Sequence, residues 1–241
     1  MDLGIEGKVA LVTASSRGLG RATALALAAE GVRVMLSGRD PATLEATRQE
    51  VAAVGGSVDA CAGDVTDPGQ PARLVAATVE RFGALDILVA NAGGPPPGRA
   101  LDLGDADLEA ALNANLLTSV RLVREALPHM RSSGWGRICC ITSYTVTQAA
   151  PVLALSNTAR TGLWAWIKTA ANDLASESSG ITLNMACPGP HATDRMKQLG
   201  GSGAMGDPSD FGAVVTFLCS AQAAFVNGSA VVVDGGATLA L

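Results

Sequence analysis

The sequence has few side chains that suit acid–base chemistry. Its 241 residues include one tyrosine, Tyr144, and two histidines, His129 and His191, and aromatic residues make up only 3%. A mechanism that needs a phenol or an imidazole therefore has three candidates. No apolar run approaches the roughly 20 residues that span a bilayer, and the first residues lack the pattern of a signal peptide. We expect a cytoplasmic protein without membrane contacts.

Charge and cysteine are also scarce. Charged residues make up 16%, the net charge is −5, and there is no basic stripe, so we expect no nucleic-acid partner. The five cysteines form no CxxC pair and no metal spacing with histidine. We expect no metal, and cysteines that serve as small buried residues in a reducing compartment. The 48% of hydrophobic residues and the 28 glycines indicate a folded, globular chain.

Short β-branched runs alternate with longer alanine- and leucine-rich segments. Strands are predicted at 9–13, 33–37, 57–61, 86–90, 137–142, 181–186 and 229–233. Helices are predicted at 18–30, 41–54, 67–82, 105–130, 155–177 and 208–220. The pairs Asp40-Pro41 and Asp67-Pro68 are typical of helix starts. This order predicts an α/β fold: a doubly wound, Rossmann-type parallel sheet of seven strands with helices on both faces, in a single domain over residues 1–241.

A glycine-containing turn follows the first strand. Gly18 and Gly20 would let the backbone approach a diphosphate at the start of the next helix, where free N–H groups favour anions. The second strand ends without the acidic residue that holds the ribose 2′-hydroxyl in NAD sites. It ends in Arg39, and Arg17 lies in the glycine turn. Two guanidiniums can bracket a 2′-phosphate, so we predict NADP(H) over NAD(H). Alternatively, Arg39 only solvates the start of the following helix.

Several ordered motifs resemble the short-chain dehydrogenase/reductase family, and in particular the 3-oxoacyl-[acyl carrier protein] reductases. The turn TASSRGLG is similar to TGxxxGxG with Ala14 at the first glycine, and an Asp-Val pair, an Asn-Ala-Gly segment, a PGxxxT-like segment and a VDGG ending follow in order. The resemblance implies a homodimer or homotetramer that binds a small-molecule substrate. It implies cofactor contacts at Ser15, Ser16, Arg17, Gly18, Leu19, Gly20, Arg39, Asp64, Val65, Asn91, Ala92, Gly93, Arg160, Pro188, Gly189 and Thr193.

The same resemblance assigns catalytic positions. Asn115 and Ser143 match two members of the family's tetrad, whereas Ser156 stands at the tyrosine and Arg160 at the lysine. A serine hydroxyl ionises far less readily than a tyrosine near pKa 10, and arginine keeps its proton. The chain also resembles a subgroup with an AGGPPPG loop and a Leu-Ser-Asn segment, whose members are described as reductase-like with an incomplete tetrad.

The source of the missing proton is therefore open. Tyr144 follows Ser143 directly, at the carboxyl end of the fifth strand where ligands bind in such sheets. The alternative for Tyr144 is a packing aromatic. His191 lies near the expected nicotinamide, and its alternative is an exposed loop histidine. A water molecule near Ser156 is the third source.

The segment 194–207 is rich in glycine and is predicted to form a short flexible lid over the substrate. Two functions remain open at this point. The first is an NADPH-dependent oxidoreductase that acts on a carbonyl or hydroxyl compound. The second is a non-redox nucleotide-binding protein, a lyase or an isomerase on the same scaffold.

Overall fold

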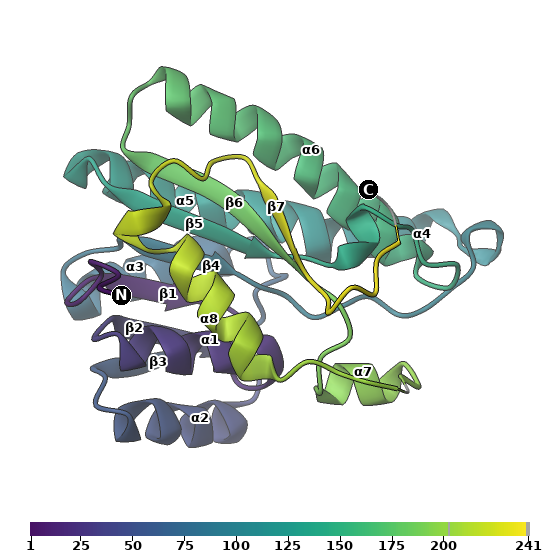
Figure 1. Ribbon diagram of the computed structural model, residues 1–241, viewed down its shortest axis with the longest axis horizontal. Coiled ribbons are helices and arrows are strands. Elements are labelled where there is room, and N and C mark those ends of the chain that lie inside the picture. Colours follow the sequence, from purple (N-terminus) through teal and green to yellow (C-terminus); the bar gives the residue numbers. More distant parts are fainter. Residues whose placement is uncertain (202, 240–241) are drawn as a thin grey trace.

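The computed structural model describes residues 1–201 and 203–239. Its strands are β1 (Val9–Val12), β2 (Arg33–Gly38), β3 (Val58–Ala62), β4 (Ile87–Ala90), β5 (Gly136–Ile141), β6 (Ile181–Pro188) and β7 (Ala230–Val233). They form one parallel sheet in the order β3-β2-β1-β4-β5-β6-β7 (Figure 1). The predicted seven-stranded, doubly wound sheet is confirmed.

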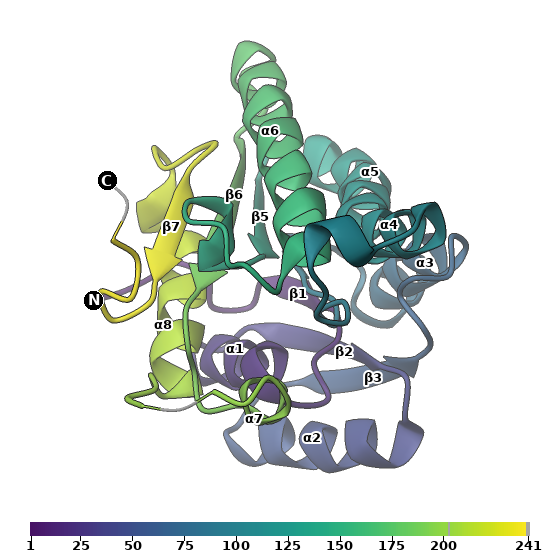
Figure 2. The same ribbon diagram turned by 90° about the vertical axis from the view of Figure 1, so that its right-hand side faces the viewer.

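Helices cover both faces of the sheet (Figure 2). One face carries α1 (Gly18–Ala29), α2 (Pro41–Ala53) and α8 (Pro208–Leu218), and the other carries α3 (Gln70–Phe82), α4 (Asp105–Leu112), α5 (Thr118–Ser133) and α6 (Ala154–Ser176). Neighbouring strand residues face opposite sides. In β1, Val12 packs in the cluster that contains Leu27 and Phe211, and Leu11 in the one that contains Leu122 and Leu163. The alternating helices therefore bury both faces of every central strand.

The helix starts follow local capping chemistry. Asp40 accepts a hydrogen bond from the backbone N–H of Thr43 at 2.7 Å, as predicted, and Asp207 caps α8 in the same way. The predicted start at Asp67-Pro68 is wrong. The Asp67 carboxylate accepts from the N–H of Gly69 at 3.0 Å in a turn, and α3 begins at Gln70. A capping aspartate and a turn aspartate are indistinguishable when the sequence alone is read.

The predicted helix over 105–130 is interrupted. A π-helical turn, η2 (Asn113–Leu117), separates α4 from α5. The Thr118 hydroxyl donates to the carbonyl of Asn113 at 2.9 Å, inside this widened turn. Turns of this kind concentrate at functional sites, and η2 contains Asn115, a predicted catalytic residue. Helix α5 then runs past Pro128 to Ser133 and ends at Gly134, which has a φ of 66°.

Three further features concern membrane-spanning helices, metal ligands and cysteines. Over residues 1–201 and 203–239, no helix is both long and apolar enough to cross a membrane. In the same ranges no three histidine, cysteine or acidic side chains come close enough together to hold a metal ion. Cys139, Cys140, Cys187 and Cys219 are buried, as predicted, and burial raises the pKa of each thiol. Cys61 is only partly buried, and all five are free.

Candidate dinucleotide and active site

The turn between β1 and α1 has the geometry of a phosphate cradle. Helix α1 begins without a side-chain cap and without an acidic residue in its first turn, so its first N–H groups are free to bind an anion. Gly18 has a φ of 58°, and a Cβ atom on Gly20 would lie 2.5 Å from the carbonyl oxygen of Ala14. The buried Ser15 hydroxyl donates to the Val12 carbonyl at 2.8 Å and accepts from the N–H of Ser37. That side chain therefore holds the turn together and is not available to a ligand.

Ala14 occupies this turn in a left-handed conformation, with a φ of 46°. This backbone costs a residue with a Cβ atom about 1–2 kcal/mol. We expect Ala14→Gly to raise the free energy of unfolding by about 0.5–1 kcal/mol, because glycine relieves that strain but is more flexible when unfolded. Thermal unfolding measures the change. Ala52→Gly, in the exposed part of α2, is the matched control and should destabilise by about 1 kcal/mol. An equal loss of unfolding free energy in both variants would show that the Ala14 backbone is not strained.

Asn91, which directly follows β4, joins two walls of the site. The glycine turn is the first wall, and the segment that follows β4 is the second. Its side-chain nitrogen donates to the carbonyl of Ala14 at 3.2 Å. Its backbone N–H donates to the Thr13 hydroxyl at 2.8 Å, and that hydroxyl donates to the Asn91 carbonyl at 2.7 Å. The Asn-Ala-Gly segment and the glycine turn are thus fixed as one unit.

The two arginines predicted to bind a 2′-phosphate both act on carboxylates that follow β2 and β3. Arg39 is largely exposed and lies 3.8 Å from the carboxylate of Asp64. The charge of Arg17 contributes to lowering the pKa of Asp40, although hydrogen bonds from Thr43 lower it more. The Asp64 carboxylate also accepts two hydrogen bonds from Thr66, and the backbone one is the largest cause of its lowered pKa. Both guanidiniums remain free to bind a phosphate, because one long, exposed ion pair contributes little.

The third wall follows β6. A Cβ atom on Gly189 would lie 2.4 Å from Cβ of Asp234, so the Pro188-Gly189 turn packs directly on the C-terminal segment. The Thr193 side chain comes within 3.7 Å of the Cβ position of Gly18, and its hydroxyl caps the short helix α7 (Asp194–Gln198). The three walls therefore meet at the carboxyl edge of the sheet, where α7 lies in the foreground of Figure 2. Of the other predicted cofactor contacts, Ser16, Leu19, Ala92 and Gly93 lie on these segments, whereas Val65 follows β3 beside Asp64 and is buried in the core.

Ser143 occupies the carboxyl end of β5. Its hydroxyl oxygen accepts from the backbone N–H and from the hydroxyl of Thr145, at 3.2 and 3.0 Å. Both bonds use its lone pairs, so its own O–H remains available to a ligand. Tyr144 opens the 3₁₀ turn η3 (Tyr144–Val146) and is half-buried. Its hydroxyl makes no hydrogen bond with another described residue.

Two buried side chains with unpaired polar atoms lie on neighbouring elements: Asn115 on η2, which packs against α6, and Arg160 on α6. Asn115 is 4% exposed, and neither its side-chain oxygen nor its side-chain nitrogen has a hydrogen-bond partner in the described ranges. Arg160 is 8% exposed; its Nη1 donates to the Ile141 carbonyl at 3.2 Å, and its Nε has no such partner. Burial, and secondarily the charge of Arg195, lowers the pKa of Arg160 to about 10. Leaving such groups unpaired is costly, so each is a candidate for binding water or ligand. Ser156, one helical turn before Arg160 on α6, is also buried.

His191 is not an exposed loop residue, and that alternative is wrong. It is 4% exposed, its Nδ1 lies 3.1 Å from the Gly189 carbonyl, and its ring packs edge-on against Phe211. A parallel bridge pairs it with Gly206 at the base of segment 194–207. These contacts do not include Ser143, Ser156 or Arg160. The structure therefore gives His191 a place at the root of the predicted lid, packed against α8.

One residue close to these segments, Arg195, was not predicted from the sequence. Arg195, on α7, donates from Nη2 to the carbonyl of Pro95 in the loop after β4. It thereby crosses from the segment after β6 to the segment after β4. The helical start at Thr193 could have indicated it, since a helix within the lid would point one basic side chain towards that loop.

Comparison with known proteins agrees with this geometry. The profile of a family described as "Enoyl-(Acyl carrier protein) reductase" matches residues 13–238. A 3-oxoacyl-[acyl-carrier-protein] reductase from Synechocystis sp. is 34% identical over 243 residues, which cover 96% of this chain and 97% of that protein. The chain belongs to the short-chain dehydrogenase/reductase family of oxidoreductases.

Solved structures place the whole chain on the same fold. The L-sorbose reductase from Gluconobacter frateurii, complexed with NADPH and L-sorbose, has a TM-score of 0.93 and 28% identity, with 100% of each chain covered. A 3-oxoacyl (acyl-carrier-protein) reductase from Agrobacterium tumefaciens, with NADP bound, has a TM-score of 0.89 and 30% identity, covering 98% of this chain and 96% of that one.

Proposed function

We propose that this protein is an NADP(H)-dependent oxidoreductase that interconverts a carbonyl and a hydroxyl compound, with Ser156 and Arg160 in place of the usual tyrosine and lysine. The observation that carries the proposal is the position of the unpaired polar atoms. Asn115 and Arg160 expose less than a tenth of their surface, yet have polar atoms without partners in the described ranges, and Arg160 bonds the carbonyl of Ile141, two residues before Ser143. Fully decayed sites would have no reason to retain such costly groups.

Different residues of the chain would have different roles in such a reaction. The bound nicotinamide would supply or accept the hydride. The free O–H of Ser143 would donate to the substrate oxygen and orient it, because Thr145 already supplies the two hydrogen bonds that the Ser143 oxygen accepts. Arg160 would hold the ribose hydroxyls through its unpaired Nε, and the glycine turn would hold the diphosphate.

The proton would come through water. The unpaired oxygen and nitrogen of the Asn115 side chain can together accept from and donate to one water molecule in the space that the short Ser156 side chain leaves. Tyr144 is the second candidate, since its hydroxyl has no partner among the described residues and its neighbour is Ser143. His191 is the third and the least supported, because its contacts lie at the root of segment 194–207.

The preference for NADP(H) is tested at Arg39. We expect Arg39→Gln to weaken NADPH binding about tenfold and to leave NADH binding within about twofold, because only NADPH carries the 2′-phosphate. Cofactor fluorescence titration measures both affinities. Arg48→Gln removes an exposed arginine of α2 that pairs with Glu45, and it is the matched control. A wild-type preference for NADH would refute binding of the 2′-phosphate by Arg39. An equal loss of affinity for both cofactors in Arg39→Gln would refute it too.

The alternative function, a non-redox protein on this scaffold, is tested by restoring the family's residues. The double variant Ser156→Tyr, Arg160→Lys should change kcat/KM for the natural reduction by less than about tenfold, since the tyrosine hydroxyl that displaces the water supplies the same proton. Rates are measured over a panel of ketones and β-ketoesters, with NADPH affinity as the check on folding. A gain of about 10³-fold or more would indicate that the natural site does something other than reduce carbonyls.

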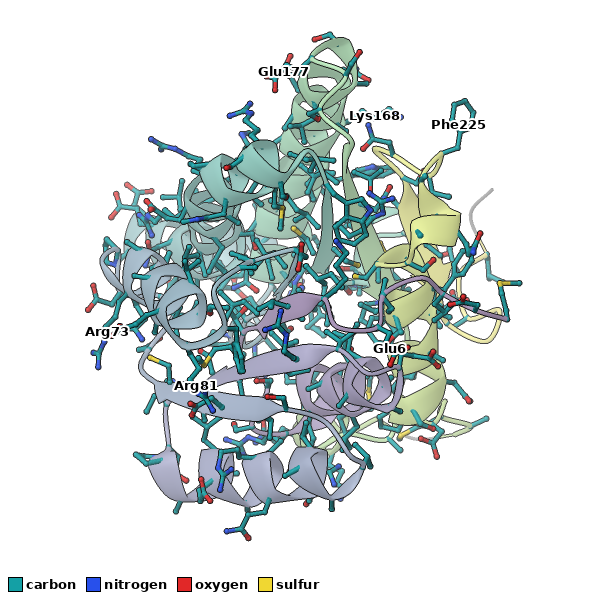
Figure 3. The ribbon with its side chains drawn as sticks, turned by 90° about the vertical axis from the view of Figure 1, so that its left-hand side faces the viewer. Glu6, Arg73, Arg81, Lys168, Glu177 and Phe225 are labelled. Atoms are coloured by element: carbon teal, nitrogen blue, oxygen red, sulfur yellow. The ribbon has the colours of Figure 1, made fainter. Side chains whose placement is uncertain are left out.

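We also propose a homo-oligomer, a dimer or a tetramer. Strand β7 is the edge of the sheet, and Phe225 beside it is fully exposed (Figure 3). A fully exposed phenylalanine at an open sheet edge is costly unless covered. Light scattering from the purified chain gives the assembly mass, and a monomer at micromolar concentration would refute this proposal.

A further inference from the structure

Two arginines without carboxylate partners in the described ranges bond backbone carbonyls of neighbouring segments, one in the loop after β4 and one at the end of β5. Arg195 extends from α7 to the carbonyl of Pro95, and its Nε lies 3.0 Å from the Cβ position of Gly94. Arg160 extends from α6 to the carbonyl of Ile141. No ion pair joins either one to an acidic side chain within the described part of the chain.

A buried arginine with a purely structural role looks different in this same molecule. The guanidinium of Arg137 donates to three backbone carbonyls, those of Ser220, Gly136 and Gly180, and stacks on Trp135 at 4.6 Å. Arg160 is similarly buried but has one carbonyl partner and an unpaired Nε. Its site is therefore incomplete without a ligand.

The two charges also act on each other. Arg195 is partly buried, and its charge contributes, after burial, to the lowered pKa of Arg160. Both guanidiniums remain protonated near neutral pH. Two like charges that are both partly or wholly removed from water repel, so an anion placed between them would gain from both. The acidic residue nearest in sequence, Asp194, pairs with Lys197 on the exposed side of α7.

We propose that the substrate is an anionic carbonyl or hydroxyl compound, an oxo acid or hydroxy acid, whose carboxylate binds Arg195 with support from Arg160. This inference rests on the proposed function. Arg195 keeps four of its five N–H donors after the bond to Pro95, enough for a bidentate grip on a carboxylate. The charge that acts on Arg195 is that of Arg160, which reaches the end of β5 two residues before Ser143, whereas the start of α1, Arg17 and Arg39 are the groups available to the dinucleotide phosphates. Arg195 is thus a specificity-determining residue.

Binding to the oxidised-cofactor complex tests the proposal without turnover, because NADP⁺ has no hydride to give to an oxo compound. The full chain is saturated with NADP⁺ and titrated by calorimetry with 2-oxohexanoate and 3-oxohexanoate, each paired with its methyl ester. One of the acids should bind at least about tenfold more tightly than its ester. Arg195→Gln should abolish that preference and Arg195→Lys should retain part of it. Arg73→Gln, at an exposed arginine of α3 that Figure 3 labels, should behave as wild type.

Three results would overturn the inference. The first is equal binding, or no binding, of acids and esters by the wild-type chain. The second is a preference for the acid that survives Arg195→Gln. The third is a loss of NADPH affinity in Arg195→Gln with the acid preference intact, which would assign Arg195 to the diphosphate of the dinucleotide.

Failure of the proposed function is distinguishable from these results. It appears as a wild-type chain that binds no NADP(H), or that binds it and reduces neither acids nor esters. In the first case the acid–ester comparison, repeated without cofactor, still decides whether the two arginines bind a carboxylate. In the second case the titrations of the NADP⁺ complex, carried out as described, still decide whether the two arginines bind a carboxylate.

Discussion

Replacing Ser143 with alanine should lower kcat/KM for carbonyl reduction by about 10²- to 10³-fold and leave the Kd for NADPH within about twofold. The hydroxyl of Ser143 accepts two hydrogen bonds from Thr145 and so keeps its own proton for the substrate oxygen. Alanine removes that donor at the point where negative charge develops. Steady-state kinetics with the best substrate of the carbonyl panel give the rate, and fluorescence titration gives the cofactor affinity.

A structural role for Ser143 makes a different prediction. Loss of the acceptor for Thr145 would then lower the melting temperature and the cofactor affinity together with the rate. Ser176→Ala, at the end of α6, removes a serine whose hydroxyl donates to the Asp173 carbonyl, and it should match wild type in all three measurements. A Ser143→Ala enzyme with unchanged kcat/KM would remove this residue from the reaction.

Gly20→Ala should weaken NADPH binding by at least about tenfold and destabilise the fold by about 1–3 kcal/mol. The new Cβ atom would lie 2.5 Å from the Ala14 carbonyl oxygen and 2.8 Å from the side-chain nitrogen of Asn91. The first of these is backbone and cannot swing away, so the glycine turn and the start of α1 must separate. The N–H groups that cradle the diphosphate would then no longer point to one place.

The matched control for Gly20 is Gly69, which precedes α3. Gly69 has a φ of −83°, and only the Asp67 carboxylate lies within 4 Å of its Cβ position, at 3.7 Å. Gly69→Ala should therefore leave NADPH affinity unchanged and shift the melting temperature by less than about 2 °C. Equal NADPH affinities of Gly20→Ala and wild type would show that this turn does not bind the dinucleotide.

Much of the fold was predictable because strand and helix segments differ in their apolar period. Every strand of the sheet overlaps a predicted strand, and Asp40 with Pro41 marked the start of α2 correctly. The start of α3 and the π-helical turn η2 were not predictable in this way. Each goes with a local side-chain hydrogen bond that the residue type permits but does not require, from the N–H of Gly69 to Asp67 in one case and from the hydroxyl of Thr118 to the Asn113 carbonyl in the other.

The candidate site was predictable where backbone shape imposes a residue type. Glycine at positions 18, 20 and 189 is required by a positive φ or by a close approach, and such requirements can be read in sequence. Contacts between side chains that lie far apart in the sequence cannot be predicted in this way. The burial of His191 against Phe211, the unpaired atoms of Asn115 and the reach of Arg195 to Pro95 depend on how separate segments pack.

The most direct test of the central claim is a single-turnover reaction with NADPH deuterated at C4 of the nicotinamide. The account predicts that an oxo-acid or ketone substrate consumes one NADPH per site and that deuterium appears on the former carbonyl carbon of the alcohol product. A chain that binds NADPH but transfers no deuterium to any carbonyl compound of the panel would contradict it.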